Sequence, residues 1–191
     1  RVVLKNPLML AKNNGVIMKL GVLKEPEGET RVAIVPTSLK KLQKAGFEVV
    51  IESGAGVAAN YHDAEYEAAG ATVGSRDDAL ACETIITIRF PGVEGMKEGT
   101  NLACVSDPFR NPQFVKDCLA NNITLLSMDM IPRRLSRAQS MDVNSSQDNL
   151  AGYKAVLLGA AHVPKGIPMM TTSAGTVSED APRKRMCTPR S

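Results

Sequence analysis

The amino-acid sequence predicts an α/β protein built on a doubly wound, mostly parallel sheet. About six short apolar segments alternate with segments of helical periodicity, which is typical of parallel sheets with helices on both faces. The chain has 191 residues, of which 43% are hydrophobic and 23% are charged, as expected for a globular domain. Because tryptophan is absent and aromatic residues make up only 4%, aliphatic side chains must form the core.

The first predicted strand, residues 20–23, is a short apolar run. A helix is expected after residues 35–37, because Leu39 and Leu42 recur at helical spacing. Gly46 suits the position just past the end of this helix, where glycine is common. The next expected elements, in chain order, are a strand at 47–51, a helix at 63–69, a strand at 71–73 and a helix at 77–81.

The strand predicted at 84–88 is an apolar, β-branched run that is typical of a strand buried on both faces. A further strand is expected at 102–105. Asn111 and Pro112 then provide an N-cap and a first-turn proline for a helix, and the last strand is expected at 123–127. The side chains that this helix is expected to bury are Phe114, Val115, Cys118 and Leu119.

Residues 133–147 lack clean periodicity and contain three arginines, several serines, Gln139 and Asp142. A polar segment after a strand offers donors and acceptors for a carboxamide, ribose or phosphate, although a surface loop explains the same composition. Ser145 with Asp148 three residues later fits a capping box. The helix that it opens has an apolar stripe formed by Leu150, Tyr153, Val156, Leu157 and Ala160.

A G-x-G-x-x-A string at residues 54–59 follows the second predicted strand. In dinucleotide-binding units such glycines let a helix N-terminus approach a pyrophosphate, and the helix starts inside the motif. Here the next helix signal is Asp63, which lies beyond the motif. A structural turn is therefore the favoured interpretation, and a dinucleotide site is the alternative.

A charged loop at residues 24–31 follows the first strand. Ligands of open α/β sheets bind at the carboxyl ends of strands, and the fork of Arg31 could hold a carboxylate there. The alternative is a solvated loop whose charges form local ion pairs.

The four cysteines, Cys82, Cys104, Cys118 and Cys187, have no C-x-x-C spacing, and the chain has only two histidines. We therefore expect no metal site, and the cysteines are interpreted as small core side chains. His62, in a polar turn, and His162, near a helix end, lack a pattern of catalytic partners.

The formal net charge of +3 resides in the flanks, because residues 18–177 carry two more acidic than basic side chains. This charge is too weak to indicate nucleic-acid binding, and the short apolar runs predict no membrane insertion. Codons for Asn13–Met18 can contain a GGAG sequence ahead of an ATG, as in a bacterial gene. We therefore expect residues 1–17 to be a translated leader before a natural start at Met18, with a disordered basic tail as the alternative.

Three strings carry a resemblance to a known family: R-A-Q-S-M-D at 137–142, S-S-Q-D-N-L-A-G-Y at 145–153 and P-M-M-T-T-S-A-G-T-V at 168–177. They resemble the NAD-binding component, or alpha subunit, of proton-translocating NAD(P) transhydrogenase. The N-terminal motifs Lys-Glu-Pro and Glu-x-Arg within 24–31 are shared with the related alanine dehydrogenases. That relative implies a catalytic histidine after the strand at 102–105, where this chain has Ser-Asp-Pro.

The resemblance implies an oxidoreductase that transfers hydride directly between NAD(H) and the NADP(H) held by a partner component, coupled to proton translocation. Carried over by position, Arg134, Asp142 and Ser145 would orient the nicotinamide carboxamide, with Arg137 also among the cofactor-binding residues. Gln139 would reach toward NADP(H), so that Gln139 and Asp142 are the implied catalytic residues.

One departure concerns the arginines. The family has one arginine fewer after Pro132, so that Arg133 competes with Arg134 for the family role. We prefer Arg134 because of its distance along the chain from Gln139.

The resemblance also implies an incomplete two-domain protein whose second, Rossmann-type domain with the pyrophosphate site is missing. Residues 18–162 would form the first domain, and 163–177 would begin the crossover to the second. Residues 178–191, with two prolines and a basic cluster, are expected to be an unrelated disordered tail from a shifted or prematurely ended reading frame. By itself, such a chain should bind NAD(H) very weakly and not turn over.

The implied partners are the transhydrogenase beta subunit, the membrane component and a second copy in a homodimer. The implied location is cytoplasmic and peripheral to the inner membrane. Two other functions stay open: a catalytically silent dimerisation or partner-binding module, and an alanine dehydrogenase-like amino-acid oxidoreductase.

Overall fold

The computed structural model describes residues 18–163, 170–172 and 175–177. The chain divides into two units, residues 1–141 and 142–191, which are described separately. The predictions for residues 1–17, for residues 178–191 and for Cys187 lie outside the described residues.

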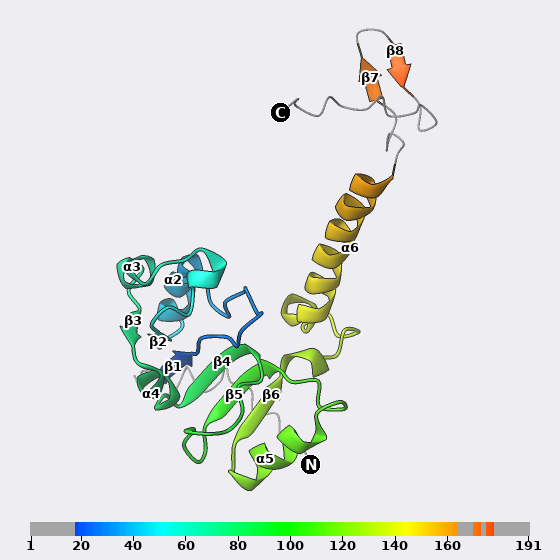
Figure 1. Cartoon of the computed structure of the whole chain (residues 1–191). Coiled ribbons are helices and arrows are strands. Elements are labelled where there is room, and N and C mark those ends of the chain that lie inside the picture. Colours follow the sequence, from blue (N-terminus) through cyan, green and yellow to red (C-terminus); the bar gives the residue numbers. More distant parts are fainter. Residues whose placement is uncertain (1–17, 164–169, 173–174, 178–191) are drawn as a thin grey trace. The chain divides into compact units, whose positions relative to one another are not determined.

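The first unit contains a parallel sheet of six strands in the order β3-β2-β1-β4-β5-β6 (Figure 1). The chain builds one half of the sheet outward from β1 and the other half outward from β4, which is the doubly wound order of dinucleotide-binding folds. The predicted fold class is therefore confirmed. The strands are β1 (Met18–Val22), β2 (Phe47–Glu52), β3 (Thr72–Gly74), β4 (Thr84–Arg89), β5 (Asn101–Val105) and β6 (Thr124–Ser127).

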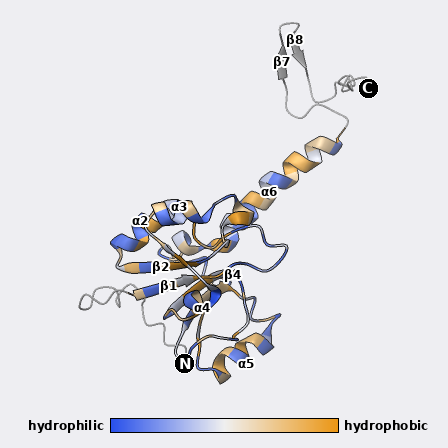
Figure 2. Cartoon of the chain, turned by 60° about the vertical axis from the view of Figure 1, so that its left-hand side comes forward, coloured by the Kyte–Doolittle hydropathy of each residue, from blue (hydrophilic) through white to orange (hydrophobic). Residues whose placement is uncertain are grey.

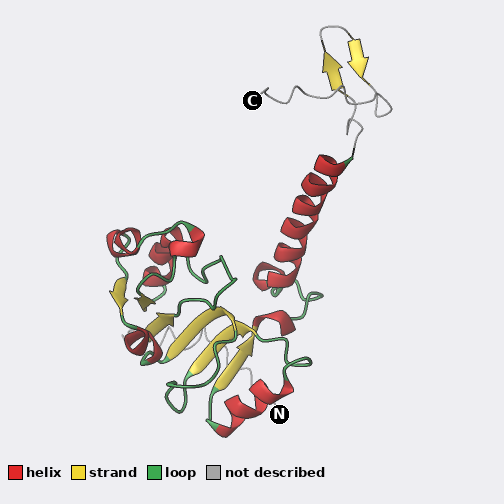
Figure 3. Cartoon of the chain, viewed as in Figure 1, coloured by secondary structure: helices red, strands yellow, loops and turns green. Residues whose placement is uncertain are grey.

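Helices cover both faces of this sheet (Figure 3). They are α2 (Pro36–Lys44), α3 (Asp63–Ala68), α4 (Arg76–Leu80) and α5 (Pro112–Ala120). One core cluster joins Leu39 of α2 and Tyr66 of α3 to one face, and the other joins Leu80 of α4 and Phe114 of α5 to the opposite face. Each strand contributes alternate side chains to the two clusters, because successive strand residues point to opposite faces.

Gly21 in β1 brings α4 close to the sheet. It pairs in register with Val50 and Ile85, which belong to the α4 side of the core. A Cβ at Gly21 would lie 2.1 Å from the carbonyl oxygen of Ala79 in α4. The absence of a side chain therefore lets the backbone of α4 lie directly against β1.

Helix α5 confirms one part of its prediction and corrects another. Phe114 and Cys118 are buried at 6% and 2% exposure, whereas Val115 and Leu119 are 37% and 80% exposed. A nine-residue helix on the outside of a sheet buries one stripe, and the two exposed residues are each turned by about 100° from that stripe. The prediction that all four are buried was too broad.

Cys82, Cys104 and Cys118 are buried, which confirms their interpretation as core side chains. Burial raises the pKa of the Cys104 thiol to about 12, so this thiol stays protonated and unreactive at neutral pH.

The second unit begins with α6 (Val143–His162) and contains an antiparallel pair, β7 (Met170–Thr172) and β8 (Gly175–Val177). Much of α6 is hydrophobic in Figure 2. Its large apolar side chains Leu150, Tyr153, Val156, Leu157 and Leu158 are each at least 49% exposed. None of the helices in the described part of the chain is long and apolar enough to cross a bilayer.

Candidate functional site

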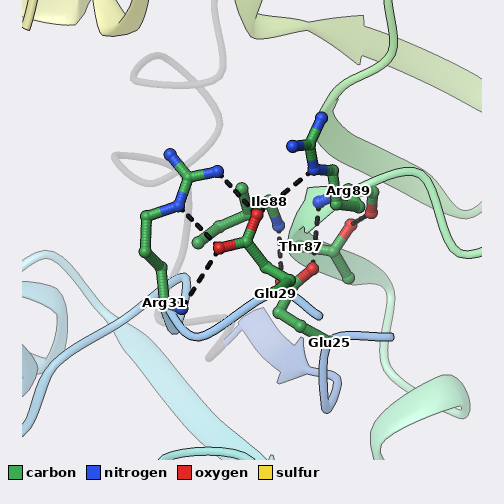
Figure 4. A network of polar contacts seen from close by, with 6 residues as sticks. All are labelled: Glu25, Glu29, Arg31, Thr87, Ile88 and Arg89. Atoms are coloured by element: carbon green, nitrogen blue, oxygen red, sulfur yellow. Dashed lines mark hydrogen bonds and ion pairs between the residues drawn. The ribbon is translucent and has the colours of Figure 1, made fainter. Parts of the chain in front are cut away.

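The loops after β1 and β4 meet at the point where the order of the sheet reverses. β1 and β4 are neighbours, and the chain leaves them toward opposite edges of the sheet. In open α/β sheets the crevice at this point, beyond the carboxyl ends of the strands, is where ligands bind. Figure 4 shows a network of six residues there: Glu25, Glu29, Arg31, Thr87, Ile88 and Arg89.

Glu25 ties the two loops together. Its carboxylate accepts hydrogen bonds from the backbone N–H groups of Ile88 at 2.6 Å and Arg89 at 3.0 Å. Burial raises the pKa of Glu25, while these two hydrogen bonds oppose the shift. The Thr87 hydroxyl donates to the Arg89 carbonyl at 2.7 Å, which further orders the end of β4.

Arg31 forms a bidentate pair with Glu29 of its own loop. Arg31 Nε and Nη2 donate to the two carboxylate oxygens of Glu29 at 2.7 and 2.6 Å. Arg89 Nε adds a third contact to Glu29 at 3.2 Å. The solvated loop with local ion pairs is therefore the arrangement observed, and the carboxylate that Arg31 holds belongs to this chain.

A hollow of about 430 Å³ lies beside this network. Its volume falls within the range of small-molecule sites. Its lining is formed by Pro26, Glu27, Gly28, Glu29, Arg89 and Phe90.

Glu29→Gln should lower the free energy of unfolding at neutral pH by about 1 kcal/mol, since the arginine partners are partly exposed. The Arg31 hydrogen bond, more than any other contact, lowers the pKa of Glu29 from 4.5 to about 2. A carboxylate with a lowered pKa stabilises the fold above about pH 4.5, and this contribution disappears as the pH falls toward 2. Urea unfolding at several pH values should therefore show a difference between wild type and variant that shrinks below pH 4.5.

Glu27→Gln removes the same charge from the same loop and is the matched control. A difference between wild type and Glu29→Gln that grows on acidification would contradict this assignment of Glu29.

The G-x-G-x-x-A string forms a turn, which supports its structural interpretation. The next α-helix starts at Asp63, after a 3₁₀ turn at Val57–Ala59. The Asp63 carboxylate accepts from the Ser53 hydroxyl at 2.7 Å and from the Gly54 N–H at 2.9 Å. A Cβ at Gly56 would lie 2.6 Å from the ring of Tyr66. The glycine therefore provides room for a buried tyrosine, and an internal carboxylate takes the N–H that a phosphate would need.

The polar segment after β6 begins with a 3₁₀ turn at Met128–Met130 and ends in the first unit with another at Gln139–Met141. The predicted cofactor residues Arg134, Arg137 and Gln139 are exposed, and so is Arg133. Ala138, at 5% exposure, is buried between them and anchors the segment.

In the second unit, Asp142 and Ser145 lie together at the start of α6. Asp142 is the N-cap, and its carboxylate accepts the Ser145 backbone N–H at 2.9 Å and the Ser145 hydroxyl at 2.6 Å. The predicted cap of Ser145 with Asp148 is therefore wrong, because the helix begins at Val143 and places Ser145 inside its first turn. An aspartate three residues before a serine was the available signal.

Sequence reasoning missed Glu25 and Asp129 as organisers of the sheet's carboxyl edge. Each is an acidic residue within three positions of a strand end, and each accepts backbone N–H groups from another loop. Among the described residues, no group of three or more histidine, cysteine, aspartate or glutamate side chains could hold a metal ion.

Residues 21–151 match the family model described as alanine dehydrogenase/PNT, N-terminal domain. An NAD(P) transhydrogenase subunit alpha chain of Rhodospirillum rubrum is 44% identical over 171 residues, covering 84% of this chain and 44% of that relative. The crystal structure of transhydrogenase from Sinorhizobium meliloti has a TM-score of 0.76 and 41% identity, with 83% of this chain and 49% of that chain covered. An L-alanine dehydrogenase structure has a TM-score of 0.58 and 27% identity, with 63% and 34% covered. The chain thus spans less than half the length of these proteins.

Proposed function

The chain belongs to the alanine dehydrogenase/PNT N-terminal domain family, and we propose that it acts as the N-terminal part of a transhydrogenase alpha subunit. The proposed activity is hydride transfer between NAD(H) and NADP(H), coupled to proton translocation. The observation that carries the proposal is the 44% identity to a transhydrogenase alpha subunit over 84% of the chain. The resemblance predicted from the sequence motifs is confirmed at the level of this family.

The proposed cofactor residues suit a nicotinamide carboxamide. A carboxamide oxygen accepts hydrogen bonds, as from the guanidinium of Arg134 or Arg133, and its NH₂ group donates, as to the carboxylate of Asp142. Ser145 holds that carboxylate in one orientation through two hydrogen bonds. The bound nicotinamide would supply the hydride, while the protein supplies position and excludes water.

Gln139 is proposed to act together with Asp142 at the reaction centre, facing NADP(H) on the partner component. Its side chain is exposed beside the buried Ala138, so it is available to a partner while its backbone is held. Arg137 is proposed as a further cofactor contact.

We propose residues 18–162 as the first domain and 163–177 as the start of the connection to a second domain that holds the pyrophosphate. The chain alone is then expected to bind NAD(H) weakly and to be inactive. The Asp63 carboxylate on the Gly54 N–H supports this, because it would repel a phosphate at the only G-x-G string within the described residues.

The proposed partners are the beta subunit, the membrane component and a second copy of the chain, in a location that is cytoplasmic and peripheral to the inner membrane. The exposed apolar side chains of α6 support contact between this helix and further protein. They also favour the second candidate function, a silent dimerisation or partner-binding module.

The test joins residues 18–177 to the C-terminal part of the Rhodospirillum rubrum relative and supplies an NADP(H)-binding component. We expect hydride transfer from NADH, and Gln139→Ala should reduce it by about 100-fold, since small misplacements of reacting groups cost this much. Ser140→Ala, at the adjacent exposed position, is the matched control and should keep the rate.

Three other results would reject the proposal. Pyruvate-dependent oxidation of NADH would indicate an alanine dehydrogenase-like enzyme, and partner binding without hydride transfer would indicate the silent module. Calorimetry giving a micromolar dissociation constant for NADH and the unextended chain would contradict the expected weak binding.

A further inference from the structure

Asp129 joins the ends of β5 and β6. It lies in the 3₁₀ turn directly after β6, and its carboxylate accepts the backbone N–H groups of Ser106 at 3.2 Å and Asp107 at 2.9 Å. The Ser127 hydroxyl donates to the same carboxylate at 2.6 Å and lies 2.7 Å from the Ser106 hydroxyl. We call the four residues Ser106, Asp107, Ser127 and Asp129 the β5–β6 clamp.

The clamp is held from the other side by Asn111. Its side-chain amide donates to the carbonyl oxygens of Ser106 at 3.0 Å and Asp107 at 3.2 Å. Asp107 has a φ of +42°, which a side chain other than glycine adopts only where surrounding contacts hold it. The loop after β5 is thus constrained through its N–H groups by Asp129 and through its carbonyls by Asn111.

The clamp favours an ionised Asp129. Burial acts to raise the pKa of this carboxyl, but hydrogen bonds from the Ser127 hydroxyl and from backbone N–H groups, including those of Ser106 and Asp107, outweigh burial and lower the pKa. Hydrogen bonds to a charged acceptor are about twice as strong as neutral ones. The attachment is therefore strong at neutral pH.

The polar segment leaves the sheet from this clamp. Beyond Asp129, residues 132–137 are all exposed, and Ala138 is the next buried residue. Within the described part of the first unit, the segment that carries Arg134 and Gln139 is thus held at its start by Asp129 and near its end by Ala138. The direction in which the chain passes Asp129 determines where the intervening side chains lie.

We propose that Asp129 is a positioning residue for the segment 131–141: its carboxylate fixes the exit of the chain from β6 and thereby the placement of Gln139. That Gln139 serves hydride transfer rests on the proposed function, whereas the coupling between Asp129 and the segment is a property of this chain. The proposal assigns Asp129 itself no contact with a cofactor.

The test is amide hydrogen exchange on the whole chain with Asp129→Asn, which cannot present two anionic oxygens to the N–H groups. We expect about tenfold faster exchange at Ser106 and Asp107, and also at Ala138, Gln139 and Met141, whose N–H groups bond within the segment. Asp117→Asn removes the same charge from α5, where the carboxylate accepts a local side-chain bond from Gln113, and should leave all five amides unchanged.

Ser127→Ala removes one hydrogen bond of the clamp, keeps the charge and covers the case in which Asp129→Asn does not fold. It should show the same pattern with a smaller amplitude. Faster exchange confined to Ser106 and Asp107, or spread evenly over the chain, would overturn the proposal, because it would leave Asp129 a purely local or global stabiliser.

In the protein joined to the C-terminal part of the Rhodospirillum rubrum relative, Asp129→Asn should reduce kcat for hydride transfer by about 100-fold. The KM for NADH should change little, because placement rather than binding is lost. An equal loss through KM would contradict the positioning role. If the wild-type joined protein is inactive while the exchange pattern appears as expected, the proposed function fails and the positioning role of Asp129 stands.

Discussion

Replacing Gly21 by valine is expected to prevent stable folding, and Gly21→Ala should lower the free energy of unfolding by about 3 kcal/mol or more. A Cβ at this position would lie 2.1 Å from the carbonyl oxygen of Ala79 and 3.0 Å from its carbonyl carbon. These are backbone atoms of α4, so no rotamer change can relieve the overlap, and the helix must move away from the sheet. Such overpacking typically costs about 1–3 kcal/mol and more where the neighbours cannot relax.

Urea denaturation followed by circular dichroism measures this loss. The matched control is Gly159→Ala in α6, where a Cβ meets nothing within 4 Å. It should leave stability unchanged or raise it by up to about 1 kcal/mol, because alanine is the better helix former. Equal stabilities for Gly21→Ala and Gly159→Ala would show that α4 does not rest on Gly21.

Tyr66→Ala is expected to destabilise the chain by about 3–5 kcal/mol, the usual cost of removing a buried aromatic ring. Tyr66 is fully buried in the core on the α2 and α3 side. Its ring lies at an edge-to-face angle to Tyr61 with centroids 6.4 Å apart. Its hydroxyl donates to the carbonyl of Ile34 at 3.0 Å. Tyr66→Phe keeps the ring and should cost only about 1–2 kcal/mol, because one buried carbonyl loses its partner.

The same tyrosine makes stability depend on alkaline pH. Burial raises the pKa of Tyr66 from 10 to about 12. A group whose pKa is raised in the folded state contributes stability that is present below pH 10 and is lost as the pH rises toward 12. The stability difference between wild type and Tyr66→Phe, measured by urea unfolding, should therefore shrink over this interval. A constant difference would contradict the assignment.

The elements were predictable because they depend on local patterns. Apolar β-branched runs identified the strands to within one or two residues, and Pro36, Gly46 and Pro112 marked helix ends at their observed places. The position of the polar segment after the last strand of the sheet was predictable for the same reason. The burial of α5 was overestimated, because hydrophobic composition does not show which stripe of a short helix meets the sheet.

The candidate site was predictable in its residue types but not in its pairings. The sequence identifies Arg31 as a carboxylate ligand, yet the carboxylate that reaches it is Glu29. It identifies Ser145 as a cap, yet Asp142 takes that place. Each pairing depends on where a helix or strand begins, and a shift of one to three residues there changes the partner.

By itself the sequence determined the alternation of strands and helices, the location of the polar segment and the family motifs, because each of these is written in neighbouring residues. Only the tertiary structure decided which carboxylate meets which donor: Glu25 on the end of β4, Asp63 on the G-x-G turn and Asp129 on the loop after β5. The physical reason is that these donors are backbone N–H groups, which every residue except proline carries and no sequence pattern marks. Their availability is set by how the strands end and where the loops between them pass.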